Sequence, residues 1–193
     1  MKYRIVGLDP SLRNLGIAKG YFDTETKKLT IDTCITVCPK VSKGKLRVGT
    51  KDILRVRYLL DELVLQIKDA DLVIAEVPIG SQSASAMKSY AICVALLAMV
   101  QKIKGELIEV TPQQVKAIVG NLEASKADVI QWVKERHPEA PLELYRGSIN
   151  ATKAEHQADA IVAIYAGLKT LQSEYRKHHE DYSYSSRLPY CYF

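Results

Sequence analysis

The chain opens with three short stretches in which apolar residues dominate and polar turns separate them. They cover Tyr3 to Leu8, Gly16 to Phe22 and Leu29 to Val37, with Asp23-Thr24-Glu25-Thr26 between the last two. Short spacing of this kind predicts three strands joined as antiparallel hairpins. The first strand runs into Asp9, and a carboxylate buried at the end of an apolar strand has to be paired or metal-bound.

The pattern then changes to a helical period. From Asp52 to Lys68 the apolar residues predict one buried stripe. The apolar run from Asp71 to Glu76 predicts a strand that again ends on an acid, and Pro78 and Gly80 end it. A long helix from Ser83 to Lys104 and a strand from Glu106 to Val110 follow. The predicted stripe consists of Ile53, Val56, Leu60, Leu63 and Ile67.

From Thr111 to about Leu171 the chain is predicted to be mainly helical. Thr111-Pro112 is typical of an N-cap and first turn, in a helix that ends near Gly120. Ser125 and Asp128 form a capping box for a helix that Pro138 ends. After a loop through Gly147 and Asn150, a final helix runs from about Ala154 to beyond Leu171.

This order of elements predicts an α/β fold with a mixed five-stranded sheet, three antiparallel strands and then two parallel ones, flanked by helices. We expect one domain over residues 1–172. Residues 173–193 form a tail without apolar period, which either lies on the surface or binds bases or a partner through its tyrosines. Those tyrosines are Tyr175, Tyr182, Tyr184, Tyr190 and Tyr192.

Composition narrows the class of protein. A formal charge of +5 over 193 residues permits a polyanionic partner without requiring one. The four cysteines lack metal-binding spacing, so zinc and a disulfide framework are not expected. The longest apolar run, 91–100, is about half of a membrane span, and no glycine-rich phosphate loop or serine elbow is present. We expect a cytoplasmic protein without a membrane partner or an organic cofactor.

Basic residues are concentrated between Pro39 and Arg57, where Asp52 is the only acid. This basic block is a candidate surface for phosphate contact. The alternative is a solvated loop that runs into the polar face of a helix. The block consists of Lys40, Lys43, Lys45, Arg47, Lys51, Arg55 and Arg57.

Acidic residues and one histidine form a candidate cation-binding site. His156 and Asp159 are three apart, and Glu155 and Asp159 four apart, so each pair shares one face of a helix that continues as an apolar run. With Asp9 and Glu76 at strand ends, three acids and an imidazole could converge. Carboxylates about 4 Å apart repel by about 4 kcal/mol at an effective dielectric near 20, and divalent cations reverse that penalty.

Oxygen donors suit Mg²⁺, and one imidazole nitrogen leans the site toward Mn²⁺. Two such ions can activate water and stabilise both oxygens of a phosphodiester displacement. The alternative gives these residues separate structural roles: a turn, a surface charge, a helix cap and a core hydrogen bond.

Four segments resemble the RuvC family of Holliday junction resolvases, within the ribonuclease H-like superfamily. Gly7-Leu8-Asp9-Pro10-Ser11-Leu12-Arg13-Asn14-Leu15-Gly16 is similar to the first acidic strand and turn of the family, and Val73-Ile74-Ala75-Glu76 to the second acidic strand. The segment from Thr111 to Gly120, with Ala124-Ser125-Lys126, resembles the part that contacts DNA. His156-Gln157-Ala158-Asp159-Ala160 resembles the closing helix.

The resemblance implies a ribonuclease H-like fold and a homodimeric endonuclease that cuts branched DNA to 5′-phosphate and 3′-hydroxyl ends. Asp9, Glu76, His156 and Asp159 would be the catalytic residues and metal ligands. The residues implied or expected to contact DNA are Lys116, Lys126, Arg13, Lys43, Lys45 and Arg47. After Glu76 the chain reads Val77-Pro78-Ile79-Gly80, where bacterial members carry an aromatic residue that helps to open the junction. The basic block and the tyrosine-rich tail have no counterpart in the family pattern either, and together they indicate a divergent member, for which bacterial and phage origins both stay open.

Two rival functions stay open. One is another ribonuclease H-like nuclease that acts on RNA or DNA flaps, and the other is a noncatalytic nucleic-acid binder with the same fold. A sugar-kinase-like ATPase also begins with a strand, an acid and a turn, but it needs a second phosphate motif and a longer chain.

Overall fold

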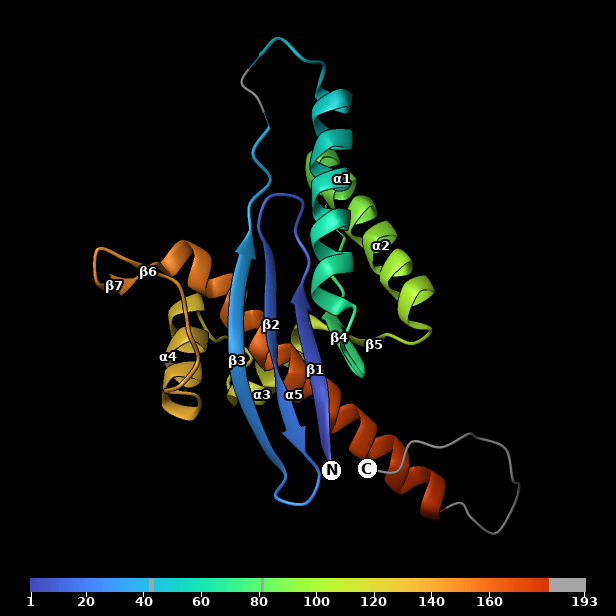
Figure 1. Ribbon diagram of the computed structural model, residues 1–193, viewed down its shortest axis with the longest axis vertical. Coiled ribbons are helices and arrows are strands. Elements are labelled where there is room, and N and C mark those ends of the chain that lie inside the picture. The colour runs from blue at the N-terminus through green and yellow to red at the C-terminus, as the bar shows by residue number, and fades with distance from the viewer. Residues whose placement is uncertain (42–43, 81, 181–193) are drawn as a thin grey trace.

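The three opening strands, β1 (Lys2–Asp9), β2 (Leu15–Asp23) and β3 (Lys28–Val37), pair antiparallel in the computed structural model of the chain (Figure 1). The structure describes residues 1–41, 44–80 and 82–180. The register places Asp9 opposite Gly16, on either side of the turn between β1 and β2. The predicted strands are confirmed, each within two residues of its expected bounds.

Two parallel strands, β4 (Leu72–Glu76) and β5 (Ile108–Val110), complete the sheet in the order β3-β2-β1-β4-β5. β4 is parallel to β1, and β5 is parallel to β4. The predicted mixed sheet is therefore confirmed. The central position belongs to β1, whose residues from Ile5 to Leu8 are buried.

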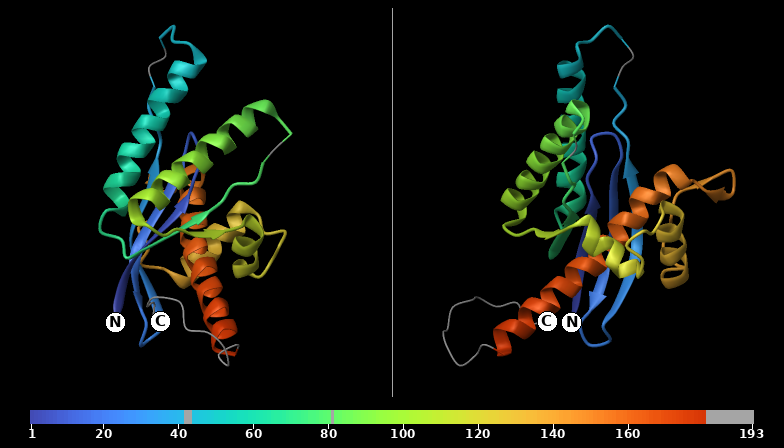
Figure 2. Two further views of the ribbon diagram at one scale, coloured as in Figure 1. Left: turned by 90° about the vertical axis from the view of Figure 1, so that its right-hand side faces the viewer. Right: turned by 180° about the vertical axis from the view of Figure 1, so that it is seen from behind.

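Helices cover both faces of the sheet (Figure 2). α1 (Val48–Ile67) and α2 (Ala84–Lys104) pack on one face, where they share a core with Val6 and Leu8 of β1. α3 (Pro112–Val119), α4 (Lys126–Arg136) and α5 (Ala151–Glu180) pack on the other. α5 is the central helix of that layer, and its residues from Ala160 to Ile164 are fully buried.

The stripe predicted for α1 is partly wrong. Leu63 and Ile67 are buried as expected, but Ile53 is 70% exposed, and Asp52 and Leu59 are buried instead. Asp52 is buried because its carboxylate bonds Arg55 at 2.8 Å and Lys88 of α2 at 2.7 Å. The predicted stripe contained apolar residues only, so it could not include the buried Asp52.

The helix signals read from the sequence are confirmed. Thr111 forms a capping box with Gln114 at the start of α3, and Ser125 forms one with Asp128 at the start of α4. These reciprocal bonds satisfy backbone amides that the first helical turn leaves without partners. Gly120 follows α3 in the left-handed conformation expected of a helix end.

The segment before α5 differs from the prediction. In place of a loop, β6 (Leu144–Tyr145) and β7 (Ser148–Ile149) form a short hairpin, and α5 starts three residues earlier than expected. α5 also continues through residues 173–180, so the boundary expected at 172 does not coincide with the end of an element. The rest of the expected tail, with Tyr182, Tyr184, Tyr190 and Tyr192, lies outside the described residues.

Candidate active site

Two carboxylates leave the sheet at the same edge. β1 and β4 are parallel neighbours, with Leu8 beside Ala75, and the next residue of each strand is Asp9 and Glu76 respectively. Parallel pairing brings the carboxyl ends of both strands to one edge. Both acids are half-buried there, so the predicted pairing of two strand-end acids is present in the fold.

The backbone of α5 lies directly against this edge. A Cβ atom on Gly16 would collide with the carbonyl oxygen of His156, and one on Gly7 would collide with that of Ala160. Glycine at both strand positions therefore lets the helix approach the sheet more closely than any side chain would permit. This approach brings His156 to Asp9, and Nδ1 of His156 lies 2.7 Å from Oδ2 of Asp9.

The electrostatics indicate that the acids of three elements influence one another. Burial raises the pKa of Glu76 to about 8, with the negative charges of Asp9 and Asp159 adding to the rise and Lys116 opposing it. Burial and the charge of Asp9 raise the pKa of Asp159 to about 7, against the effect of His156. A cation would lower both values because it stabilises the ionised forms.

A chain of polar contacts extends from Asp9 across α5 to α4. Nε2 of His156 lies 3.4 Å from Oε1 of Glu155, and Nζ of Lys126 lies 2.8 Å from the same oxygen. Burial alone would lower the pKa of His156, but the bond to Asp9 and the charges of Asp9, Glu155 and Asp159 raise it. Glu155, which the resemblance does not include among the site residues, thus connects His156 to Lys126.

The donor set fits a hard divalent cation in its chemistry: carboxylate oxygens and an imidazole nitrogen. Within the described residues, however, no three His, Cys, Asp or Glu side chains are placed so that they could hold one ion as they stand. The bond between Asp9 and His156 occupies a ligand atom of each residue. Oδ2 of Asp9 and Nδ1 of His156 are therefore not free to bind a cation in this arrangement.

The expected DNA contacts are spread over several elements. Lys116 of α3 and Lys126 of α4 are exposed, as is Arg13 in the turn after β1. The ion pair of Lys126 with Glu155 means that this lysine already has a partner. The charge of Lys116 acts on Glu76, so Lys116 lies near the acids, and Arg13 belongs to the turn that joins Asp9 to β2.

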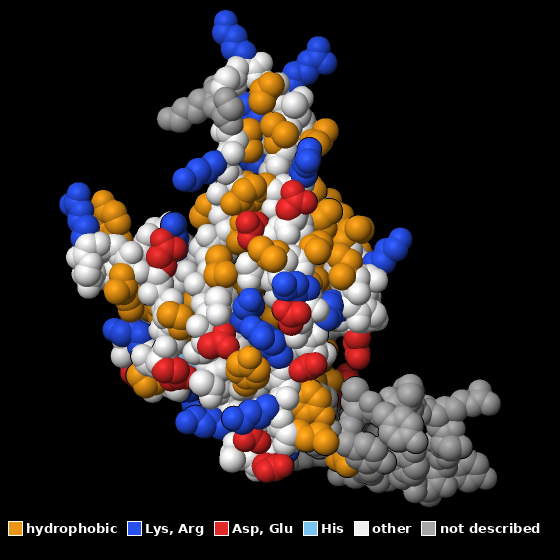
Figure 3. Space-filling view, in the orientation of Figure 1, with side chains coloured by type: hydrophobic (Ala, Val, Ile, Leu, Met, Phe, Trp, Pro, Cys, Tyr) orange, Lys and Arg blue, Asp and Glu red, His pale blue; other side chains and the backbone are white. Residues whose placement is uncertain are grey.

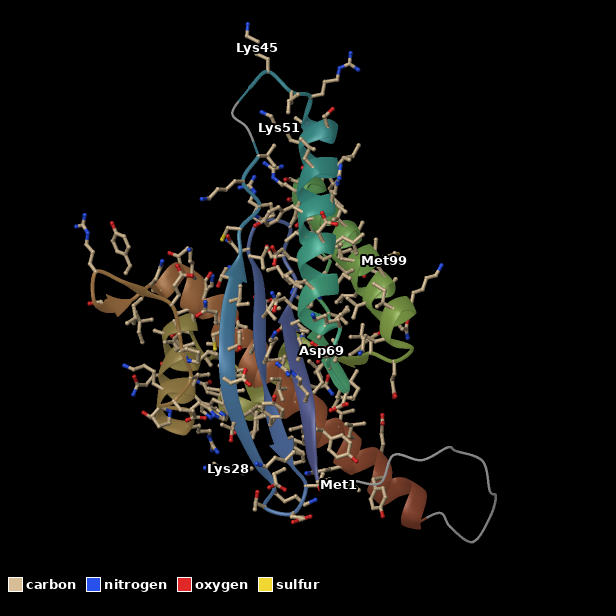
Figure 4. The ribbon with its side chains drawn as sticks, in the orientation of Figure 1. Met1, Lys28, Lys45, Lys51, Asp69 and Met99 are labelled. Atoms are coloured by element: carbon tan, nitrogen blue, oxygen red, sulfur yellow. The ribbon has the colours of Figure 1, made fainter. Side chains whose placement is uncertain are left out.

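The basic block lies farther away. Lys45 and Arg47 are exposed at the tip of the projection that connects β3 to α1, where Figures 3 and 4 show basic side chains reaching outward. Lys43 lies outside the described residues. Arg55, in contrast, is bound to buried Asp52. Only part of the block is thus available for contact with a polyanion.

A cavity of about 570 Å³ lies next to Glu76, where β4 and β5 end. Val77, Pro78 and Ile79 line one side, and Tyr90 of α2 and Thr111 line others. The residues that depart from the family pattern after Glu76 thus form the wall of an open depression beside the acids.

Comparison with known proteins agrees with this geometry. Residues 5–166 match the family model described as crossover junction endodeoxyribonuclease RuvC. A search among curated protein sequences gives no match.

Three solved resolvase structures share the fold at low sequence identity. RuvC of T. thermophilus, in complex with a Holliday junction substrate, is 17% identical with a TM-score of 0.60, over 87% of this chain and 97% of that one. The yeast mitochondrial Holliday junction resolvase Ydc2 is 14% identical with a TM-score of 0.61, over 93% of this chain and 86% of that one. The fowlpox virus Holliday junction resolvase is 17% identical with a TM-score of 0.54, over 89% and 99%.

The family match covers well over half of the chain, and it includes the strand ends and the helix that bring the acids together. This chain belongs to the RuvC family of crossover junction endodeoxyribonucleases.

Proposed function

We propose that this protein is a homodimeric endonuclease that resolves four-way DNA junctions by divalent-metal-dependent hydrolysis, leaving 5′-phosphate and 3′-hydroxyl ends. One observation supports this above the others: Asp9, Glu76 and Asp159 come from three elements, and their charges act on one another at one edge of the sheet. Such mutual repulsion is costly in a fold that does not bind a cation.

In this proposal Asp9 and Asp159 hold the metal ions, and Glu76 completes their ligand shell. Two Mg²⁺ ions, for which Mn²⁺ can substitute, would supply the positive charge that activates water and stabilises the leaving oxygen. Opening of the Asp9–His156 bond frees Oδ2 of Asp9 for this role. In this proposal the side chains of the protein supply proton transfer and DNA contact.

In this proposal His156 accepts the proton of the attacking water. When the neutral ring carries its proton on Nδ1, Nε2 has the free electron pair and can accept a proton. A water oxygen then bonds to phosphorus, the bond from phosphorus to O3′ breaks, and O3′ takes a proton from solvent. The proton lost by water passes to Nε2, where the carboxylate of Glu155 at 3.4 Å stabilises the resulting positive charge.

DNA contact in this proposal uses positive charge on both sides of the acids. Lys116, Lys126 and Arg13 would contact phosphates close to the acids, and Lys45 and Arg47, at the tip of the β3–α1 projection, would contact a second duplex arm. The T. thermophilus relative with a bound Holliday junction supports a branched substrate. Lys43 stays a predicted contact.

The homodimer is supported by helix α2. By length and composition it is the one helix in the described part of the chain that is apolar enough to cross a membrane, yet only 22% of its apolar window is buried. One face packs in the core through Cys93, Leu96, Leu97 and Val100. Val94, Met99 and Ile103 lie outside this buried stripe and are exposed. A second copy of the chain would cover part of this apolar surface, as symmetric interfaces do.

The test is cleavage of a synthetic four-way junction in Mg²⁺, with a Y-fork, linear duplex and structured RNA as competing substrates. Asp9→Asn should reduce junction cleavage by about 1,000-fold or more, because several kcal/mol of charge stabilisation are lost, and should preserve junction binding. Asp69→Asn is the matched control, since Asp69 lies before β4 at the opposite end of the sheet (Figure 4).

Each outcome bears on the proposal. Junction cleavage that survives Asp9→Asn would refute the assignment of the site. Equal cutting of the fork or of RNA would support the rival nuclease functions, and binding without any cutting would support a noncatalytic role.

A further inference from the structure

The hairpin formed by β6 and β7 is short and has a tight turn. Leu144 pairs with Ile149 and Tyr145 with Ser148, and two residues make the turn. Both turn residues have positive φ, 52° at Arg146 and 80° at Gly147. This is the pattern of a type I′ turn, whose twist matches that of the paired strands, so the hairpin holds its tip in one orientation.

The base of the hairpin is fixed to the helix that carries the site. The backbone amide of Asn150 donates to the carbonyl of Glu143 at 2.9 Å, and the amide of Glu143 donates to Oε1 of Gln157 at 2.8 Å. Lys153 of α5 also forms an ion pair with Glu143. Gln157 is fully buried and directly follows His156, so the hairpin is anchored to the helix next to a site residue.

The hairpin exposes one large aliphatic and one aromatic side chain to solvent. Leu144 and Tyr145 are 60% and 61% exposed. The guanidinium of Arg146 lies 5.2 Å from the centre of the Tyr145 ring. Figures 1 and 2 show the hairpin extending from the body beside the first turns of α5. An aromatic face with a cation next to it is a combination that stacks on a nucleobase and binds the adjacent phosphate.

The distance to the acids suits such a contact. His156 lies five residues into α5, which at about 1.5 Å per residue is about 8 Å along the helix. The two-residue strands add about 7 Å at about 3.3 Å per residue. The tip therefore reaches within about 20 Å of the site, the length of about six base pairs at about 3.4 Å each. A branch point close to the cut strand falls inside that range.

We propose that Tyr145 stacks on a nucleobase at the branch point of the bound junction, while Arg146 binds a neighbouring phosphate. The β6–β7 hairpin would then select branched DNA, in which bases at the crossover can be unstacked, over continuous duplex. This inference rests on the proposed function of the site, but it concerns binding and base stacking, which can be measured without cleavage.

The test uses the Asp9→Asn protein, without divalent metal, and a four-way junction with 2-aminopurine at the branch point. Loss of one base stack by Tyr145→Ala should weaken junction binding by about 5- to 100-fold and abolish the change in 2-aminopurine fluorescence. Tyr145→Phe keeps the ring and should behave as the parent. The matched control is Tyr21→Ala, because Tyr21 is also exposed beneath an arginine, Arg4, but lies on β2 away from the site.

A second readout does not depend on the alanine variant. A junction with 5-iodouracil at the branch point should form a photochemical crosslink at Tyr145 in the Asp9→Asn protein. The inference is overturned if Tyr145→Ala binds and unstacks the junction as its parent does, or if the variant changes the oligomeric state alone, which would make the hairpin a protein contact. Failure of the parent enzyme to cut any branched DNA would refute the proposed function and leave the stacking result to be read separately.

Discussion

The replacement Glu76→Gln tests the electrostatic argument for the site directly. It keeps the shape of the side chain and removes the charge that burial and the neighbouring acids disfavour. At about 1.4 kcal/mol for each tenfold change in proton affinity, a pKa that rises from 4.5 to about 8 makes the ionised form less stable in the folded protein by on the order of 5 kcal/mol. Asp9 and Asp159 ionise in the same cluster and share part of this effect. We therefore expect the free energy of unfolding of the metal-free variant to exceed that of the wild type by about 2–4 kcal/mol at pH 9.

The sign follows from proton binding. Between pH 4.5 and about 8 the folded protein keeps a proton on Glu76 that the unfolded chain has lost, so the free energy of unfolding of the metal-free wild type falls as the pH rises through this range. Glu76→Gln should lack this decrease, so it should match the wild type near pH 4 and be more stable at pH 9. Added Mg²⁺ should restore stability at pH 9 to the wild type more than to the variant.

Urea denaturation in EDTA at pH 5, 7 and 9, repeated with Mg²⁺, measures these differences. Glu109→Gln, which removes an exposed carboxylate from the neighbouring strand β5, is the control and should follow the wild-type curve. Parallel pH curves for the wild type and Glu76→Gln would refute the conclusion that Glu76 ionises against buried neighbouring charges.

Three further predictions concern packing, DNA contact and assembly. Gly16→Ala should lower the free energy of unfolding by about 1–3 kcal/mol, because the new Cβ meets the carbonyl of His156. Gly49→Ala is the control and should not lower the free energy of unfolding, because there is open space around Gly49 on α1. Denaturant titration measures both. Lys126→Ala should reduce the salt dependence of junction binding by about one counterion, and an unchanged slope would exclude a phosphate contact. Val94→Glu on the exposed face of α2 should shift a dimer to a monomer in analytical ultracentrifugation, and an unchanged mass would remove α2 from the interface.

Much of the fold could be predicted from the chain because its signals are local. Short apolar runs bounded by polar turns marked the five strands, and the caps at Thr111 and Ser125 act within one helical turn. Where a local pattern had an exception the prediction failed, as at Asp52, whose burial depends on Lys88 of another helix. The β6–β7 hairpin was missed because Arg146, a residue seldom found at positive φ, makes half of its turn.

The sequence by itself determined which acids stand at strand ends and on the closing helix, since apolar runs stop at Asp9 and Glu76 and another begins directly after Asp159. Only the tertiary structure decided how these acids interact. Parallel pairing of β1 with β4, and the contact of Gly7 and Gly16 with the backbone of α5, bring distant segments together. Charge repulsion, burial and the bond between Asp9 and His156 depend on those distances, which no local pattern encodes.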